Sequence, residues 1–237
     1  NNPCGAASAE NLEQAYDLAI NTDPQSSFGG IISFNQEVGR KLAEKITSSF
    51  KEGVIAPSFT KGALEVLSEK GNLRVLETGS LEDYERNPTL RSLDKGWLLQ
   101  ETDEAMIDIS NCEVVTKRKP TDEEVASLQF SWKIVKHVKS NAIVFAKQKR
   151  TVGIGAGQMS RIDSVKIATF KSIPNPKDSV MASDAFFPFR DGIDEAAKEG
   201  ITAVVQPGGS VRDQEVIDAA NEHNIAMVFT GMRHFKH

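Results

Sequence analysis

Residues 201–229, ITAVVQPGGSVRDQEVIDAANEHNIAMVF, decide the fold class of this chain. Ile201 to Val205 is a short apolar run, which is typical of a strand buried on both faces. Asp213 to Glu222 has helical periodicity, and Ala226 to Phe229 is a second apolar run, so the stretch predicts a βαβ unit. A helix expected at Asp191 to Glu199 precedes it. The tail therefore predicts a layered α/β architecture.

The same alternation of helices and strands is expected upstream. Strands are predicted at Ile31 to Phe34 and Ala142 to Ala146, each preceded by a helical pattern. Thr121 and Glu124 form a capping box that begins a helix running to Lys136. Residues 77–95 have no clear period and are expected to be a surface connection. The similar order on both sides of residue 116 predicts two lobes, residues 1–116 and 117–237.

Composition excludes several classes of protein. The chain has 237 residues, 39% of them hydrophobic, and a net charge of −5, which argues against non-specific nucleic-acid binding. Its apolar runs are too short to cross a bilayer, and no basic and apolar leader is present, so no membrane association is expected. Cys4 and Cys112 form no close pair, which favours a reducing compartment. A cytoplasmic protein is the expectation.

Ser183 to Asp191 (SDAFFPFRD) is the most distinctive segment. Its period is neither helical nor alternating, and Pro188 stiffens the loop. Phe186, Phe187 and Phe189 beside charged residues would suit a planar heteroaromatic ligand. The alternative, left open by the sequence, is a loop that fills its own core with phenylalanine.

Three turn-rich junctions precede expected elements: Ser26 to Gly30, Gly153 to Arg161 and Gln206 to Asp213. Such junctions aim backbone N–H groups at bound anions, although a tight turn without a ligand is the alternative. Gly153 to Arg161 lacks the phosphate-loop lysine and misses the dinucleotide fingerprint at Gln158. A nicotinamide-dependent oxidoreductase is therefore discounted, because Asp178, the candidate ribose ligand, lies in a proline-rich loop.

Other candidate residues lie at the ends of the second lobe's strands. Asn141 precedes a strand and carries an amide able to bind a carboxamide-like ligand. His137 is interpreted as a helix C-terminal histidine. The basic and aromatic tail, Arg233 to His237, follows a core strand that should anchor it at a ligand-binding edge. No close cysteine pair or HExxH motif is present, so no metal is expected.

Together these motifs resemble one enzyme family over the whole chain. The segments that carry the resemblance are Asn2 to Gly5, Ser26 to Gly30, Ile55 to Pro57, Val115 to Lys117, Lys139 to Ala142, GIGAGQMSR at 153–161, SDAFFPFRDGID at 183–194, QPGGSVRD at 206–213 and Met232 to Phe235. They are similar to the transformylase region of the bifunctional purine-biosynthesis family that joins AICAR transformylase to IMP cyclohydrolase. AICAR is aminoimidazole carboxamide ribonucleotide.

The resemblance implies formyl transfer from 10-formyltetrahydrofolate to the 5-amino group of AICAR. It also implies two cytidine-deaminase-like α/β lobes without zinc, and a homodimer whose sites involve both chains. The residues expected at the nucleotide are Phe28, Gly29, Glu52, Asn141, Arg161, Arg233 and Phe235. Those expected at the folate are Ile162, Phe186, Asp191, Ser210 and Val211. Phe186 and Asp191 should face the same cleft as Gly155 to Arg161, and loops at opposite ends of the sheet would contradict this assignment.

The family pattern Lys-His-x-Asn-Pro places two catalytic residues just before Asn1, the x of the motif. The resemblance thus implies a C-terminal fragment without the catalytic pair and without the cyclohydrolase domain. Asn141 is then the supporting catalytic residue within the chain, and rescue by His137 is not expected. The alternative is a catalytically silent fragment that binds nucleotide or folate and dimerises. Some relatives also hold a monovalent cation near the Ser183–Asp184 loop, so a structural cation is a further implication.

Overall fold

The computed structural model describes residues 2–82, 87–173 and 175–237. The chain divides into two compact units. Unit 1 joins Asn1–Ser27 to Ile107–His237, and unit 2 is Phe28–Met106. The first two helices thus belong with the second half of the chain. The lobe boundary expected at residue 116 stays a prediction, since compactness does not define evolutionary lobes.

Unit 1 is built on a six-stranded sheet with the order β6-β11-β10-β9-β7-β8. Strands β9, β10 and β11 are parallel, as expected for a βαβ tail, and β7 runs antiparallel to both β8 and β9. The bounds are β6 Glu113–Val114, β7 Ile143–Lys147, β8 Arg150–Gly155, β9 Val180–Ser183, β10 Ala203–Gln206 and β11 Ala226–Phe229.

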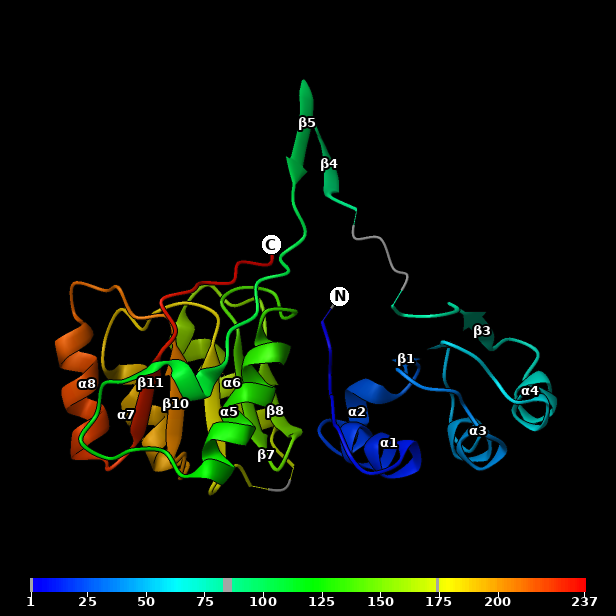
Figure 1. Cartoon of the computed structure of the whole chain (residues 1–237), viewed down its shortest axis with the longest axis horizontal. Coiled ribbons are helices and arrows are strands. Elements are labelled where there is room, and N and C mark those ends of the chain that lie inside the picture. Colours follow the sequence, from blue (N-terminus) through cyan, green and yellow to red (C-terminus); the bar gives the residue numbers. More distant parts are fainter. Residues whose placement is uncertain (1, 83–86, 174) are drawn as a thin grey trace. The chain divides into compact units, whose positions relative to one another are not determined.

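Helices cover both faces of this sheet (Figure 1). Successive residues of β7 show the alternation, because Ile143 and Phe145 pack with helices α6, α7 and α8 while Val144 and Ala146 pack with α5. The helices of unit 1 are α1 Leu12–Ile20, α2 Pro24–Ser27, α5 Asp122–Val135, α6 Arg161–Lys171, α7 Asp191–Lys198 and α8 Asp213–Glu222, with a 3-10 turn at Ile109–Asn111. Two apolar cores, one on each face, hold the layers together.

Helix α6 lies unusually close to β8, and the glycines of the GIGAG run explain why. A Cβ atom at Gly153 would lie 2.2 Å from the carbonyl oxygen of Ala168, and one at Gly155 would lie 1.9 Å from that of Ser164. Only glycine permits this approach of helix to strand. These two glycines therefore serve packing, which fixes the position of Arg161 at the start of α6.

Unit 2 contains a three-stranded parallel sheet, β1-β2-β3, together with the helices α3 and α4, which pack against each other. Its core is formed by apolar residues of both helices and of β2, among them Leu42, Ile46, Val54 and Leu67. The bounds are β1 Ile31–Ser33, α3 Arg40–Thr47, β2 Gly53–Ala56, α4 Lys61–Ser68 and β3 Arg74–Glu77.

A two-stranded hairpin follows in unit 2, formed by β4 (Thr89–Leu93) and β5 (Gly96–Gln100). The first of these strands lies within residues 77–95, which were expected to be a surface connection. That expectation is wrong for Thr89–Leu93, and residues 83–86 lie outside the described residues. The strand is exposed along its length, so no burial pattern marks it in the sequence.

The mixed α/β class is confirmed, whereas the likeness to cytidine deaminases stays a prediction. Thr121 and Glu124 form the expected capping box at the start of α5. Strand β9 is an element that the sequence did not reveal. Within the described part of the chain, every helix is too short or too polar to pass through a bilayer.

Candidate functional site

The loops singled out in unit 1 meet at one edge of its sheet. Strands β8, β9, β10 and β11 all end there, and antiparallel β7 begins there. The residues after β8, β9 and β10 are the segments containing Arg161, Phe186 and Ser210. The carboxyl edge of parallel strands is where open α/β sheets bind ligands. The loops at Gly155–Arg161 and Phe186–Asp191 therefore lie at the same end of the sheet, and the arrangement that would have contradicted the site assignment is not found.

Arg161 is the centre of a buried polar cluster at this edge. Its Nη1 donates to Ser183 Oγ at 2.8 Å and to the carboxylate of Asp184. Its Nη2 donates to Asn141 Oδ1 at 2.7 Å. The side chains of Arg161 and Asp184 are only 7% and 1% exposed. The cluster joins the start of β7, the end of β9 and the start of α6.

The amide of Asn141 is largely engaged by the protein itself. Its Nδ2 donates to the carbonyl oxygens of Gln158, at 2.9 Å, and Met159, at 3.2 Å. The Oδ1 atom accepts from Arg161, which leaves one lone pair of this oxygen for a ligand. Asn141 is thus held rigidly between the loop after β8 and Arg161.

The three phenylalanines of Ser183 to Asp191 have different environments. Phe187 is 1% exposed and belongs to the core, so the core-filling interpretation holds for this residue. Phe186 is half-buried, with the Arg233 guanidinium 5.7 Å from its ring centre. Phe189 is exposed, and the guanidinium of Arg212 lies 4.8 Å from its ring centre. Phe186 and Phe189, each beside an arginine, remain accessible to a ligand.

The tail after β11 is anchored to unit 1. His234 is buried against Trp132 of α5, with ring centres 4.9 Å apart, and its N–H donates to the carbonyl oxygen of Asp184 at 3.0 Å. Ser140 N–H donates to the carbonyl oxygen of Lys236 at 2.9 Å. Arg233 and Phe235 on either side of His234 are exposed. These contacts hold the tail at the carboxyl edge of the sheet, the place that the sequence predicts for it.

The remaining predicted folate residues lie in the loops of the same edge. Ile162 follows Arg161 in α6, and Asp191 is the first residue of α7, where its Oδ1 accepts from Gly192 N–H at 2.8 Å. Ser210 is half-buried and Val211 is fully exposed. All four are thus near the sheet edge that holds Phe186.

In two of the three turn-rich junctions, backbone N–H groups that were expected to face an anion are already bonded within the protein. In the loop after β10, Gly209 N–H and Ser210 N–H donate to the carboxylate of Asp213 at 2.7 and 3.1 Å. In unit 2, Gly29 N–H donates to the carbonyl oxygen of Phe50 at 3.1 Å. Because a side chain or carbonyl of the protein already accepts from these groups, the expectation of anion binding by them is corrected.

Beside α7, Arg190 connects two helices. It donates to Asp194 in α7 and, at 2.6 Å, to Glu222 in α8. His223 Nε2 lies 2.8 Å from Asp194 Oδ1. The hydrogen bonds from Arg190 lower the pKa of Asp194 to about 2, against the opposing effect of burial. This network fixes α7, and with it Asp191, against α8.

The predicted nucleotide residues of unit 2 also cluster. Phe28 and Phe50 have ring centres 5.5 Å apart, and Glu52 N–H donates to the carbonyl oxygen of Gly30 at 3.2 Å. Phe28, Gly29 and Glu52 lie before β1 and β2, at the amino ends of the parallel strands. This is the edge opposite to the one expected for a ligand from strand polarity alone.

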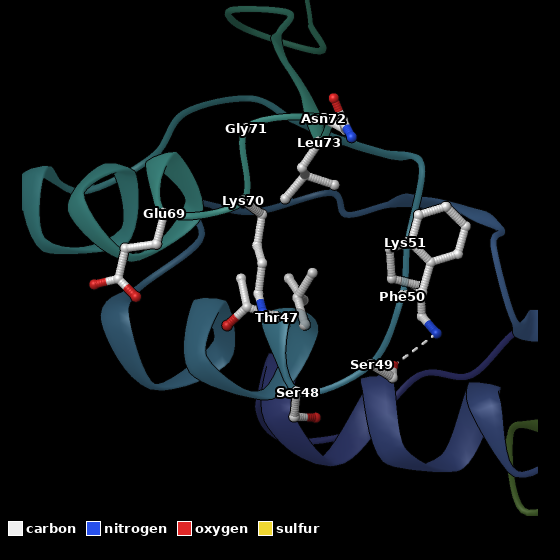
Figure 2. A pocket seen from close by; sticks show the side chains of 11 residues that line it. Thr47, Ser48, Ser49, Phe50, Lys51, Glu69, Lys70, Gly71, Asn72 and Leu73 are labelled. Atoms are coloured by element: carbon white, nitrogen blue, oxygen red, sulfur yellow. Dashed lines mark hydrogen bonds between the residues drawn. The ribbon is translucent and has the colours of Figure 1, made fainter.

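A hollow of about 420 Å³ adjoins this cluster (Figure 2). It is lined by the ends of α3 and α4 and by the segments before β2 and β3. Figure 2 shows Lys70 extending from the end of α4 toward Thr47, while Lys51 Nζ donates to Ser49 Oγ at 2.9 Å. Two lysines, several hydroxyl groups and Phe50 make the hollow suitable for an anion attached to a ring system.

Among the described residues, no group of three or more His, Cys, Asp or Glu side chains is placed to hold a metal ion. The cation implied near Ser183–Asp184 does not fit the carboxylate. Asp184 Oδ1 accepts from Arg161 and from Ala142 N–H, and Oδ2 accepts from Ser140 Oγ. Arg161 thus already neutralises this carboxylate.

Two residues of these sites were missed as functional candidates. Asp184 was noted for its charge and for the cation implied near it, but not as a partner of Ser140 and Arg161, because these contacts depend on the order of strands in the sheet. Lys70 is one of many exposed lysines, and only the hollow distinguishes it. No local signal in the sequence identifies either residue.

A family model described as AICARFT/IMPCHase bienzyme matches residues 1–171. The chain belongs to this family. The matched residues include Phe28, Gly29 and Glu52 in unit 2 and Asn141 and Arg161 in unit 1. The AICARFT/IMPCHase family consists of purine-biosynthesis bienzymes, so the resemblance read from the motifs is confirmed over residues 1–171. The residues after 171, which carry β9 to β11, complete the sheet edge that the matched part begins.

Proposed function

We propose that this chain provides the ligand-binding part of an AICAR formyltransferase. The observation that carries the proposal is the convergence of Asn141, Arg161, Phe186 and Arg233 at one sheet edge in a chain of the AICARFT/IMPCHase family. The co-substrate is 10-formyltetrahydrofolate, and the acceptor is the 5-amino group of AICAR. The supporting argument is chemical, because the edge combines an amide, cations and accessible aromatic rings.

In this reaction the amine nitrogen attacks the formyl carbon, and a new C–N bond forms. The bond between that carbon and N10 of the folate breaks, N10 takes a proton, and the amine loses one. An amine conjugated to a ring and a carboxamide is a poor nucleophile, so a base is needed at the amine and a donor at the developing oxyanion.

We expect these groups to enter next to the N-terminal segment. Asn2 Oδ1 accepts from Lys139 N–H at 2.7 Å, two residues before Asn141. In the family pattern the Lys-His pair directly precedes the position of Asn1, which lies outside the described residues. A Lys-His pair attached there enters beside the Asn141–Arg161 cluster, the histidine as proton acceptor and the lysine as the oxyanion donor.

Each unit, taken by itself, carries groups that suit these ligands. In unit 1, the free lone pair of Asn141 Oδ1 fits the carboxamide N–H of the nucleotide, while Phe186, Ile162 and Val211 fit the rings of the folate. Unit 2 by itself offers Lys70 and the hydroxyl groups of its hollow, which suit a phosphate group. Assembly into a homodimer and location in the cytoplasm remain predictions from the resemblance.

Calorimetric titration of the chain with AICAR tests the ligand assignment. We expect saturable binding, and a fall of about tenfold or more in affinity for Arg233→Met, since a cation beside the ligand is lost. Arg40→Met is the matched control, because the partners that the described residues give Arg40 are the exposed glutamates Glu44 of α3 and Glu65 of α4. A folded chain that binds neither AICAR nor 10-formyltetrahydrofolate contradicts the proposal. Binding without turnover supports the catalytically silent alternative.

A further inference from the structure

Asp184 lies at the carboxyl end of β9 and is 1% exposed. Its two carboxylate oxygens accept from three partners: Arg161 Nη1, Ala142 N–H at 3.1 Å and Ser140 Oγ. A carboxylate buried in this way is stable only while a cation and hydrogen-bond donors compensate it. Its three partners come from two different segments of the chain, one before β7 and one at the start of α6.

The backbone of Asp184 adds two further connections. Its N–H donates to the carbonyl oxygen of Ala142 at 3.3 Å, and its carbonyl oxygen accepts from His234 N–H at 3.0 Å. Asp184 therefore binds the segment Ser140–Ala142, Arg161 and the tail at the same time. Asn141 lies inside the first segment, and Arg233 and Phe235 flank His234. Every predicted nucleotide residue of unit 1 is thus bonded to Asp184 or adjacent to a residue that is.

We infer that Asp184 is a positioning residue that orients Asn141, Arg161 and the tail for the nucleotide. The identity of the ligand in this inference rests on the proposed function. The positioning of these residues by Asp184 does not depend on it. Asp184 reaches the ligand through Arg161: its charge holds Nη1, and this leaves Nη2 directed at Asn141 Oδ1. Without the charge, Arg161 loses its counter-ion and the amide of Asn141 loses its donor.

Asp184→Asn keeps the shape of the side chain and removes its charge. Asp178→Asn is the matched control, because Asp178 precedes the same strand and is an exposed carboxylate near Lys147. For Asp184→Asn we expect AICAR affinity to fall by about tenfold or more, with the affinity for 10-formyltetrahydrofolate changed less. Amide hydrogen exchange of Ser140 and Ala142 in the ligand-free protein should accelerate by about tenfold or more, relative to Val228 in the core.

A purely structural role gives a different result. The midpoint of urea unfolding would then shift, and amide exchange would rise equally at Ser140, Ala142 and Val228. The AICAR affinity per folded molecule would stay unchanged. This result would overturn the inference. If Asp184→Asn does not fold, the Ser140→Ala variant tests the inference instead. It removes one neutral donor to Asp184 and leaves the ion pair between Arg161 and Asp184 intact. It should accelerate exchange at Ala142 and weaken AICAR binding about threefold to tenfold. No change in either quantity overturns the inference.

The two proposals fail separately. A wild-type chain that binds no AICAR contradicts the proposed function, and the exchange rates of Ser140 and Ala142 still decide whether Asp184 positions this segment. A chain that binds AICAR equally well with and without the charge at residue 184 supports the proposed function and overturns the positioning role.

Discussion

The guanidinium of Arg161 donates to the carboxylate of Asp184, and both side chains are buried at the carboxyl edge of the unit 1 sheet. A buried pair of this kind contributes little net stability, because desolvation of two charges offsets their attraction. Its geometry is specific, however, since Arg161 uses two nitrogens to hold Ser183, Asp184 and Asn141. The pair is best explained by the arrangement that it imposes on the site.

Removing the charge of Lys70 should weaken phosphate binding in the hollow of unit 2. We expect Lys70→Gln to lower AICAR affinity about tenfold to a hundredfold, as for a lost charge-assisted hydrogen bond. Affinity for the corresponding nucleoside, which has no phosphate, should not change. Lys61→Gln at the other end of α4 is the control, because Lys61 does not line the hollow. Equal loss for nucleotide and nucleoside in calorimetry would contradict the role of Lys70.

Gly155→Ala should separate α6 from β8. The added Cβ would lie 1.9 Å from the carbonyl oxygen of Ser164, which is backbone and cannot rotate away. Overpacking typically lowers the unfolding free energy by about 1–3 kcal/mol, and we expect Gly155→Ala to lie at or above the upper end of this range. Gly96→Ala is the control, since a Cβ at Gly96 meets no atom within 4 Å. Urea unfolding that gives the same midpoint for both variants would show that α6 tolerates a side chain here.

Asp194 should make stability depend on pH under acidic conditions. Its pKa falls from an ordinary value of 3.8 to about 2 in the folded protein, mainly because Arg190 donates to it. Because the pKa of Asp194 is lower in the folded than in the unfolded protein, its ionised carboxylate stabilises the fold above about pH 4. This stabilisation is lost as the pH falls towards about 2. The effect is small, since the pair is partly exposed.

Thermal unfolding at pH 5 and at pH 2.5 measures this contribution. Asp194→Asn should reduce the difference in Tm between the two pH values. Asp218→Asn, an exposed aspartate of α8, should leave that difference as in the wild type. An unchanged pH dependence in Asp194→Asn would exclude the Arg190 network as its source.

Features that depend on residues close together in the sequence were predictable. The capping box of Thr121 and Glu124 and the helix Asp213–Glu222 were found because capping and periodicity are local signals. Strand β9 was not found, because Val180 to Ser183 are all buried and show no alternation, and the run is short. Because β9 was not expected, the position of Asp184 at the end of this strand could not be predicted either.

The contacts of the site were predictable only in part. The resemblance selected Asn141 and Arg161, but their mutual hydrogen bond depends on β7 lying between β8 and β9, which no sequence pattern states. The junction Gln206–Asp213 was expected to receive an anion, and the structure shows the Asp213 carboxylate in that role. A side chain four residues away competes for the same N–H groups, and a glycine pattern does not reveal this competition.

Formyl transfer itself tests the central claim most directly. Release of tetrahydrofolate would be measured at saturating AICAR and 10-formyltetrahydrofolate, for the chain as it is and for the chain extended at its N-terminus by the Lys-His pair. We predict turnover by the extended chain, and a rate lower by about a hundredfold to ten-thousandfold without the histidine base. An extended, folded chain that binds both ligands and forms no formyl-AICAR would contradict the proposed function.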